Sequence, residues 1–177
     1  NRNWGHPDLI TLLERLAKEA KSAGDWNGLL IGDLSQPRGG PMLTGHASHQ
    51  IGLDADIWLT PMPDRLLTRR EREDISATLV VKDCKTMIYM VWTEAHARII
   101  RCAASYKDVE RIFVHPPIKA ELCKWATGDR AWLAKIRPYY GHNYHFHIRI
   151  NCPAGSPTCK NQAPSRPKDG TGCGEEL

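Results

Sequence analysis

Several features that would point to other classes of protein are missing from this chain of 177 residues. It has no run of about 20 apolar residues, the length that a membrane-spanning helix needs, so no segment is expected to cross a bilayer. Its first five residues contain no apolar leader, as would also be true of a processed chain. The net charge of +4 is small and the basic residues are scattered, so nucleic acid is not expected as a partner.

No two cysteines are spaced as Cys-x-x-Cys, which argues against a structural zinc site built on cysteine. An even number of cysteines favours disulfides and an oxidising compartment. Half of them lie in a Pro- and Gly-rich tail, residues 152–177, which has little core of its own and would need crosslinks to stay docked. Free thiols are the alternative, mainly for Cys84 and Cys102. The six are Cys84, Cys102, Cys123, Cys152, Cys159 and Cys173.

The chain also shows no internal repeat and no regular alternation of strand and helix, and its length fits one domain over residues 1–177. Pro7, followed by leucines at helical spacing, predicts an amphipathic helix over residues 7–22. Thr93 is typical of the N-cap of another helix. Further elements are predicted as strands at 29–31, 54–59, 87–92, 112–114 and 144–150, and as helices at 118–126 and 130–136. This mixture predicts an α+β fold.

Histidine, by contrast, is concentrated in two short windows, which hold five of the eight histidines. An aspartate follows the first window closely. Imidazole and carboxylate groups together are the usual ligands of a catalytic zinc, with three protein ligands and one position for water. The pattern therefore predicts a zinc hydrolase. The residues are His46, His49 and Asp56, and then His142, His145 and His147.

The second window lies on the predicted strand 144–150, where successive side chains point to opposite faces. His145, His147 and Arg149 therefore share one face, and the apolar residues between them point into the core. Two histidines on one strand face are about 7 Å apart at their backbones, so one can bind a metal while the other faces the metal-bound water. An isolated His-x-His would more simply be a pair of surface histidines, but the upstream window favours the metal.

The first window has the pattern of a loop, because Gly45 and Gly52 mark turns. It differs from the helical His-Glu-x-x-His motif, and no glutamate follows His49 to act as a base. Asp56 enters a predicted strand that would fix its carboxylate. Asp54 lies on the same strand face and is a rival metal ligand.

These windows, together with the segment Gly32–Met42 before them, resemble the penicillin-insensitive murein endopeptidases. That family belongs to the zinc peptidases that include lysostaphin-type enzymes and D-Ala-D-Ala carboxypeptidases. The resemblance extends from Asn1–Leu9 to Gly172–Leu177. It implies a central antiparallel sheet flanked by helices, a periplasmic location and peptidoglycan as the partner. The implied reaction is zinc-dependent hydrolysis of the D-alanyl–meso-diaminopimelyl crosslink.

The resemblance also implies roles for single residues. His49, Asp56 and His147 would bind one Zn²⁺ per chain, and His46 would lie next to the metal or bind it. A zinc-bound water has a pKa of about 7, so a modest base suffices to activate it. The implied disulfides are Cys123–Cys173 and Cys152–Cys159, which leaves Cys84 and Cys102 as a possible third pair.

His145 would be the active-site histidine and His142 its neighbour, one accepting the water proton and the other stabilising the oxyanion. Arg38, in a Gly- and Pro-rich loop, is a candidate for binding a substrate carboxylate, although a solvated loop arginine is the simpler interpretation. Asp83 falls where relatives hold an accessory metal, but Thr86 stands where a histidine would be expected. One metal is therefore predicted.

Three alternatives remain open at this point. A D,D-carboxypeptidase or D-Ala-D-Ala dipeptidase would share the metal site but cut a free chain end. A binding module could keep fold and zinc without catalysis, although the presence of His142, His145 and His147 together argues against it. A disulfide-stapled secreted protein without metal is the third. The sequence does not determine the oligomeric state.

Overall fold

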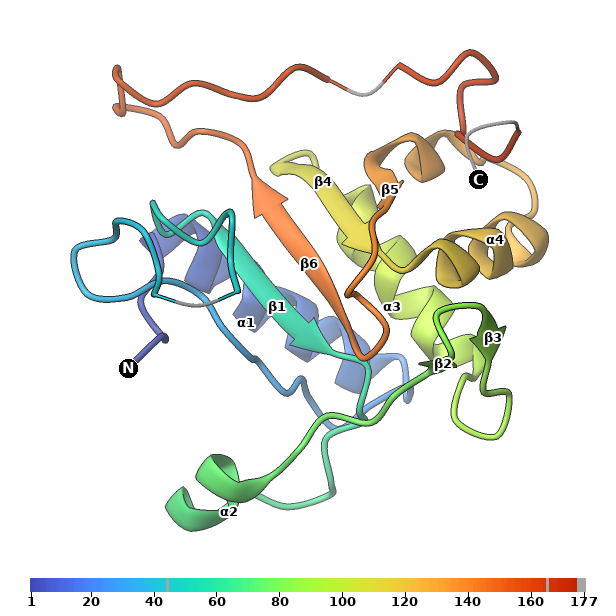
Figure 1. Ribbon diagram of the computed structural model, residues 1–177, viewed down its shortest axis with the longest axis horizontal. Coiled ribbons are helices and arrows are strands. Elements are labelled where there is room, and N and C mark those ends of the chain that lie inside the picture. Colours follow the sequence, from blue (N-terminus) through green and yellow to red (C-terminus); the bar gives the residue numbers. More distant parts are fainter. Residues whose placement is uncertain (44, 165, 175–177) are drawn as a thin grey trace.

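Four strands form the central sheet of the computed structural model, which describes residues 1–43, 45–164 and 166–174 (Figure 1). Their order across the sheet is β1 (Asp54–Trp58), β6 (His145–Ile150), β4 (Val109–Val114) and β5 (Ile136–Pro138). The first three pair antiparallel, whereas β5 runs parallel to β4 because a helical crossover returns the chain to the same end of the sheet. The predicted α+β class is confirmed, and the expected antiparallel sheet is corrected to a mixed one.

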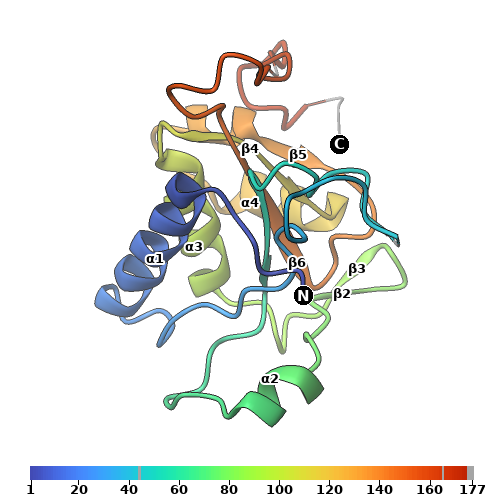
Figure 2. The ribbon, with the colours of Figure 1, turned by 90° about the vertical axis from the view of Figure 1, so that its left-hand side faces the viewer.

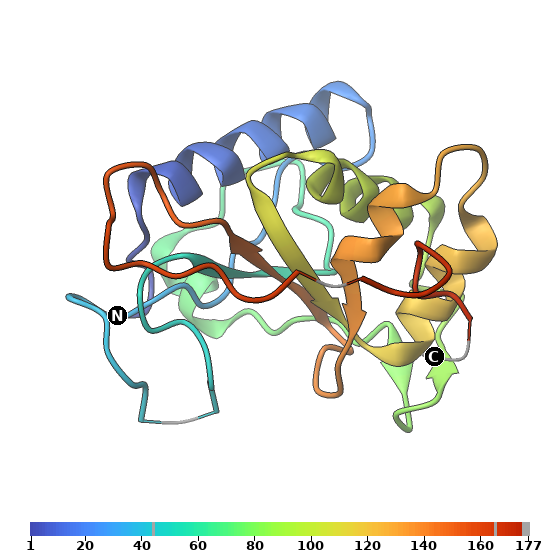
Figure 3. The ribbon, with the colours of Figure 1, turned by 90° about the horizontal axis from the view of Figure 1, so that it is seen from above.

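Two helices, α1 (Pro7–Ser22) and α3 (Glu94–Ser105), cover one face of this sheet (Figures 2 and 3). The predicted helix over residues 7–22 is confirmed at both ends. Its apolar stripe is buried, so the hydrophobic effect fixes its orientation; the stripe comprises Leu9, Leu12, Leu13, Leu16 and Ala20. Thr93 is the N-cap of α3, as predicted.

The strands divide their side chains between two faces. Ala55 and Ile57 of β1 and Phe146 and Ile148 of β6 are fully buried against the helices. Alternate residues of both strands point to the opposite face, where they line a groove together with the loop of residues 45–48. The alternation predicted for residues 144–150 is thus confirmed, and it separates an apolar core from a polar face.

Two predicted strands are wrong in whole or in part. Residues 29–31 form no strand but an isolated antiparallel bridge between Ile31 and Ile57, with hydrogen bonds from Trp58 N–H to the Leu30 carbonyl and from Gly32 N–H to the Asp56 carbonyl. In the region 87–92, only β3 (Thr86–Met87) is extended, paired with β2 (Val81–Lys82), and a turn follows. In both places short apolar runs were mistaken for strands although the backbone lies at an edge or in a turn.

Two of the remaining helices lie close to their predicted ranges, and a third was not predicted because its sequence shows no apolar residues at helical spacing. The predicted stretch 118–126 is α4 (Pro116–Trp125), which begins at a proline in the first helical position. The predicted 130–136 is a 3₁₀ helix, η1 (Ala131–Lys135). Helix α2 (Arg69–Asp74) was missed because it buries no residue and is held by a capping box between Thr68 and Glu71. None of the described helices is long and apolar enough to cross a bilayer.

The predicted tail is described except for residues 165 and 175–177, and it runs along one end of the sheet (Figure 1). The implied disulfides Cys123–Cys173 and Cys152–Cys159 are both present, which fits a compartment outside the reducing cytoplasm. The possible Cys84–Cys102 pair is wrong, because both thiols are free. Cys84 lies exposed in the β2–β3 turn, whereas Cys102 lies on α3 with its Sγ 3.0 Å from Glu19 Oε2.

Candidate metal centre

A groove with a volume of 390 Å³ lies over the polar face of β1 and β6. One wall is the loop that carries His46, the other is the turn that carries His142, and Gln162 of the tail lies at its rim. All the histidine and aspartate residues singled out around the two histidine windows line the groove except His49, which lies fully buried beside it. The lining residues are Gly45, His46, Ala47, Ser48, Asp54, Asp56, Phe113, Tyr139, Tyr140, Gly141, His142, Tyr144, His145, His147, Arg149 and Gln162.

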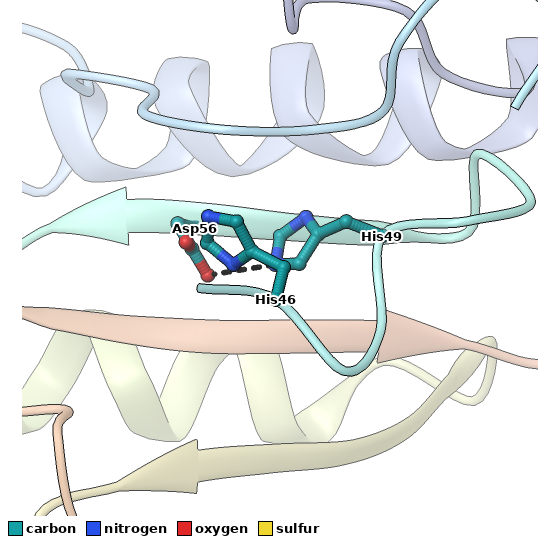
Figure 4. A group of neighbouring side chains, drawn as sticks. All are labelled: His46, His49 and Asp56. Atoms are coloured by element: carbon teal, nitrogen blue, oxygen red, sulfur yellow. Dashed lines mark ion pairs between the residues drawn. The ribbon is translucent and has the colours of Figure 1, made fainter. Parts of the chain in front are cut away.

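The local backbone explains how His49 comes to this place. His49 has a φ of 60° and Gly52 a φ of 72°, so the chain turns sharply twice before it enters β1. A β-carbon at Gly52 would lie 3.1 Å from the backbone nitrogen of His6, and the conformation there is left-handed, so glycine is required. These turns carry His49 back against β1, beside Asp56 (Figure 4).

Three side-chain atoms form a tight triangle at the centre of this site. His49 Nε2 lies 3.3 Å from Asp56 Oδ1 and 3.0 Å from His147 Nδ1. The third side, between Asp56 Oδ1 and His147 Nδ1, measures 3.1 Å. Ligands about 2.0–2.1 Å from a tetrahedral zinc are separated by about 3.3–3.4 Å, so the triangle has nearly the size that zinc requires.

The triangle also has the polarity of a cation site. His49 Nδ1 lies 2.6 Å from the carbonyl oxygen of Leu34, which can only accept, so Nδ1 carries the hydrogen and Nε2 presents its lone pair to the triangle. Asp56 Oδ1 is buried and has no hydrogen-bond partner among the described residues. Because a buried carboxylate oxygen without a donor is costly, a bound cation would satisfy an atom that the protein leaves unpaired.

His46 lies next to this triangle. Its Nε2 is 2.9 Å from Asp33 Oδ2, and its ring stacks edge-on against His49 with ring centroids 4.5 Å apart. Ligand atoms of His46, His49 and Asp56 all lie within 4.8 Å of one another (Figure 4). These three residues are therefore an alternative set of ligands for a metal ion. The contact with Asp33 orients His46 from outside the triangle.

Electrostatics in the site keep Asp56 ionised. Burial alone would raise the pKa of its carboxyl group, but the close imidazoles of His147 and His49 hold that pKa well below its usual value. Without a metal, the carboxylates of Asp54 and Asp56 raise the pKa of His147 to about 9 despite its burial, so a bound metal ion would take the place of the proton on Nδ1. The site therefore attracts positive charge even without a metal.

His142 and His145 face the same space with a different protonation. Burial lowers the pKa of both, to about 4 for His145, so both are neutral at pH 7. His142 Nδ1 lies 3.2 and 3.1 Å from the carbonyl oxygens of Tyr139 and Tyr140, which leaves Nε2 as its free acceptor. His145 Nε2 is 3.6 Å from Asp56 Oδ1. Either ring is able to accept a proton.

Other predicted site residues lie apart from this cluster. Arg38 is exposed in a turn, with a φ of 66°, and is not among the residues that line the groove, so its substrate-binding role remains a prediction without structural support. Asp83 lies in the β2–β3 turn, at a φ of 52°, also outside the groove. Three tyrosines that were not predicted as site residues, Tyr139, Tyr140 and Tyr144, form an aromatic rim of the groove. The run Tyr139–Tyr144, with three tyrosines around one histidine, was the available signal.

A buried imidazole–carboxylate triangle on the floor of an open groove, with two neutral histidines beside it, is the arrangement of a metal-dependent hydrolase site. The sequence pattern of the penicillin-insensitive murein endopeptidase family, a family of M74 peptidases, matches residues 1–177. The chain belongs to this family, as the resemblance indicated.

Individual relatives agree with this assignment. A penicillin-insensitive murein endopeptidase of Haemophilus influenzae is 49% identical over 178 residues, which cover 100% of the chain and 61% of the relative. Those of Klebsiella pneumoniae and Escherichia coli are 43% and 42% identical over 176 residues, covering 99% of the chain and 63% of each relative. The chain thus spans about three fifths of the length of these relatives.

Proposed function

We propose that this chain is the catalytic part of a zinc-dependent murein endopeptidase, which hydrolyses D-alanyl–meso-diaminopimelyl crosslinks of peptidoglycan in the periplasm. The observation that carries the proposal is Asp56 Oδ1, a buried carboxylate oxygen that no described residue donates a hydrogen bond to, with two imidazole nitrogens 3.1 and 3.3 Å away on the floor of a groove. Membership of the murein endopeptidase family supports the choice of substrate.

The donor set fits one zinc ion per chain, held by His49, Asp56 and His147. Nitrogen and carboxylate ligands of this kind select zinc at catalytic sites, and the open groove leaves room for a water and a substrate carbonyl. When bound, zinc would supply a Lewis acid that acidifies water and polarises the scissile carbonyl. His46, paired with Asp33, supports His49 from the side.

The remaining steps belong to the side chains of the groove. His145 and His142 are both neutral, so one accepts the proton of the attacking water and the other stabilises the developing oxyanion. The base then passes the proton that it took from the water to the leaving amine. The exposed rings of Tyr139, Tyr140 and Tyr144 provide an apolar rim against which an extended peptide can pack.

Digestion of purified crosslinked muropeptide dimers tests this proposal. We expect the zinc-loaded chain to convert dimers to monomers, a chelator to stop the conversion and added zinc to restore it. His147→Ala should lose both zinc and cleavage, whereas His6→Ala, a histidine at the N-cap of α1 outside the groove, should keep both. The matched pair separates a specific loss from the general effect of removing an imidazole.

Two results would overturn the proposal. Failure of the zinc-loaded chain to cut any dimer would exclude the endopeptidase function. Release of the terminal D-alanine from a linear pentapeptide, with dimers left intact, would instead identify a D,D-carboxypeptidase.

A further inference from the structure

Asp54 contacts two of the three proposed metal ligands, although it is not one of them in the triangle described above. Its side chain is fully buried on the groove face of β1, the face opposite to the apolar core. One carboxylate oxygen, Oδ1, lies 3.0 Å from His147 Nε2. The other, Oδ2, lies 3.3 Å from the backbone nitrogen of His49 and 2.8 Å from an Arg149 guanidinium nitrogen.

The chemistry of these partners fixes the direction of every hydrogen bond. A backbone N–H and a guanidinium can only donate, so Oδ2 of Asp54 accepts from both His49 and Arg149. Oδ1 is then the acceptor for His147, whose Nε2 must carry the hydrogen. In the neutral ring this leaves the lone pair on Nδ1, the atom that lies 3.1 Å from Asp56 Oδ1 and 3.0 Å from His49 Nε2.

We propose that Asp54 is a positioning residue for the metal centre: it sets the tautomer of His147 so that Nδ1 faces the metal, and it holds the backbone of His49 in place. This inference rests on the proposed metal site and adds a residue outside its ligand set. A hydrogen-bonded carboxylate behind a metal-bound histidine is a general device for orienting the ring and raising its basicity.

Asp54 is itself held from behind by Arg149, which also pairs with a second carboxylate, that of Glu110. Arg149 Nε lies 3.3 Å from Glu110 Oε2, so Arg149 bridges the two carboxylates. Glu110 Oε1 accepts a hydrogen bond of 2.7 Å from the backbone nitrogen of Gln162, in the tail. The contacts therefore run without a break from the tail through Glu110, Arg149 and Asp54 to His147.

The substitution Asp54→Asn tests whether Asp54 sets the tautomer of His147. The amide has one acceptor oxygen and one donor nitrogen, and two donors, from His49 and Arg149, face one side of it. The oxygen must turn toward these donors, so the NH₂ group faces His147 Nε2 and needs an acceptor there. His147 is then driven to carry its hydrogen on Nδ1, where it blocks metal binding.

The measurement is the dissociation constant of zinc, obtained by competition with a chromophoric chelator. We expect it to rise about 10- to 100-fold in Asp54→Asn relative to the wild type, the usual effect of losing such a partner. Asp25→Asn is the matched control, because Asp25 is a largely buried carboxylate, 6% exposed, paired with Arg98 at 2.6 Å and outside the groove. Its zinc affinity should equal that of the wild type.

A second measurement does not depend on whether the variant folds. In the cadmium-loaded wild type, NMR of labelled histidine nitrogens should show coupling of the metal to Nδ1 of His147 and a slowly exchanging hydrogen on Nε2. Coupling to Nε2, or an unchanged zinc affinity in a folded Asp54→Asn, would overturn the inference while leaving the proposed function intact. Failure of the wild type to bind zinc would overturn both.

Discussion

Asp56 of β1 stands directly opposite His147 of β6 in the antiparallel ladder, and their side chains meet on the groove face with Oδ1 and Nδ1 3.1 Å apart. Residues in this relation have their β-carbons about 5 Å apart, so the strand pairing itself brings a carboxylate and an imidazole within reach of one cation. His49 completes the triangle from a loop. The geometry of the candidate metal centre therefore depends on the sheet register as well as on the side chains that form it.

Removal of the carboxylate at the centre of the triangle should abolish metal binding. We expect Asp56→Asn to weaken zinc binding and lower kcat/KM by more than about 100-fold, since loss of even an outer partner of a ligand costs about 10- to 100-fold. Metal content after dialysis and cleavage of muropeptide dimers measure the two effects. Asp64→Asn, at an exposed position outside the groove, is the control and should retain both.

The two neutral histidines should affect turnover without affecting the metal. His145→Ala and His142→Ala should each lower kcat by about 10²- to 10⁴-fold, the usual contribution of a general acid or base. Zinc content should stay at the wild-type level, because neither ring is part of the triangle. Loss of zinc from either variant would show instead that the ring is a ligand.

Stability should depend on pH through His96, a histidine remote from the groove. Its ring is 1% exposed between Trp26 and Trp92; Nδ1 accepts from the Thr93 N–H, and Nε2 donates to the Leu59 carbonyl. Burial lowers the pKa of His96 below its usual value near 6.5, so the folded state keeps it neutral while the unfolded state binds a proton. The contribution of neutral His96 to the free energy of unfolding is therefore complete above pH 6.5 and is lost as the pH falls toward the lowered pKa.

Urea denaturation at pH 7.5 and at pH 5.0 measures this effect. The free energy of unfolding of the wild type should fall between the two values by more than that of His96→Gln, because glutamine does not titrate but can keep the capping contact to Thr93. An equal fall in both proteins would show that other groups cause the acid sensitivity.

The two disulfides should differ in their contribution to stability. They close loops with sequence separations of 50 and 7 residues, for Cys123–Cys173 and Cys152–Cys159 respectively. Loop entropy in the unfolded state predicts that the disulfide of the longer loop stabilises the fold by about 4 kcal/mol and that of the shorter loop by about 2 kcal/mol. Chemical denaturation of the two double-serine variants measures these losses, and a larger loss for the shorter loop would contradict the entropic explanation.

The two free thiols should react at different rates with a thiol reagent. Cys84 is exposed in a turn and should react at once. Cys102 is partly buried, and its burial together with Glu19 raises the pKa of its thiol to about 11, so little thiolate is present at pH 8. We expect one fast equivalent in the native protein and a second on unfolding. Absence of any free thiol after denaturation would show that Cys84 and Cys102 form a disulfide after all.

The sequence by itself determined the features that depend on neighbouring residues. The helix Pro7–Ser22 follows from a proline at its first position and an apolar stripe at helical spacing. The groove face of β6 follows from strict alternation, which sends His145 and His147 to one side whatever the strand pairs with. The types of side chain in the two histidine windows likewise predict a metal site, and the structure brings His46, His49 and Asp56 close enough together to hold an ion.

Only the tertiary structure decided how residues distant in sequence come together. His49 and His147 are 98 positions apart, and the β1–β6 register with the left-handed turn at His49 sets their 3.0 Å approach. Strand parity placed Asp54 and Asp56 on one face as rival ligands. The register gives the two aspartates different partners, because it sets Asp54 opposite Arg149, with which it forms an ion pair of 2.8 Å, and sets Asp56 opposite His147. Pairing across a sheet is non-local, so no local pattern could have distinguished the two aspartates.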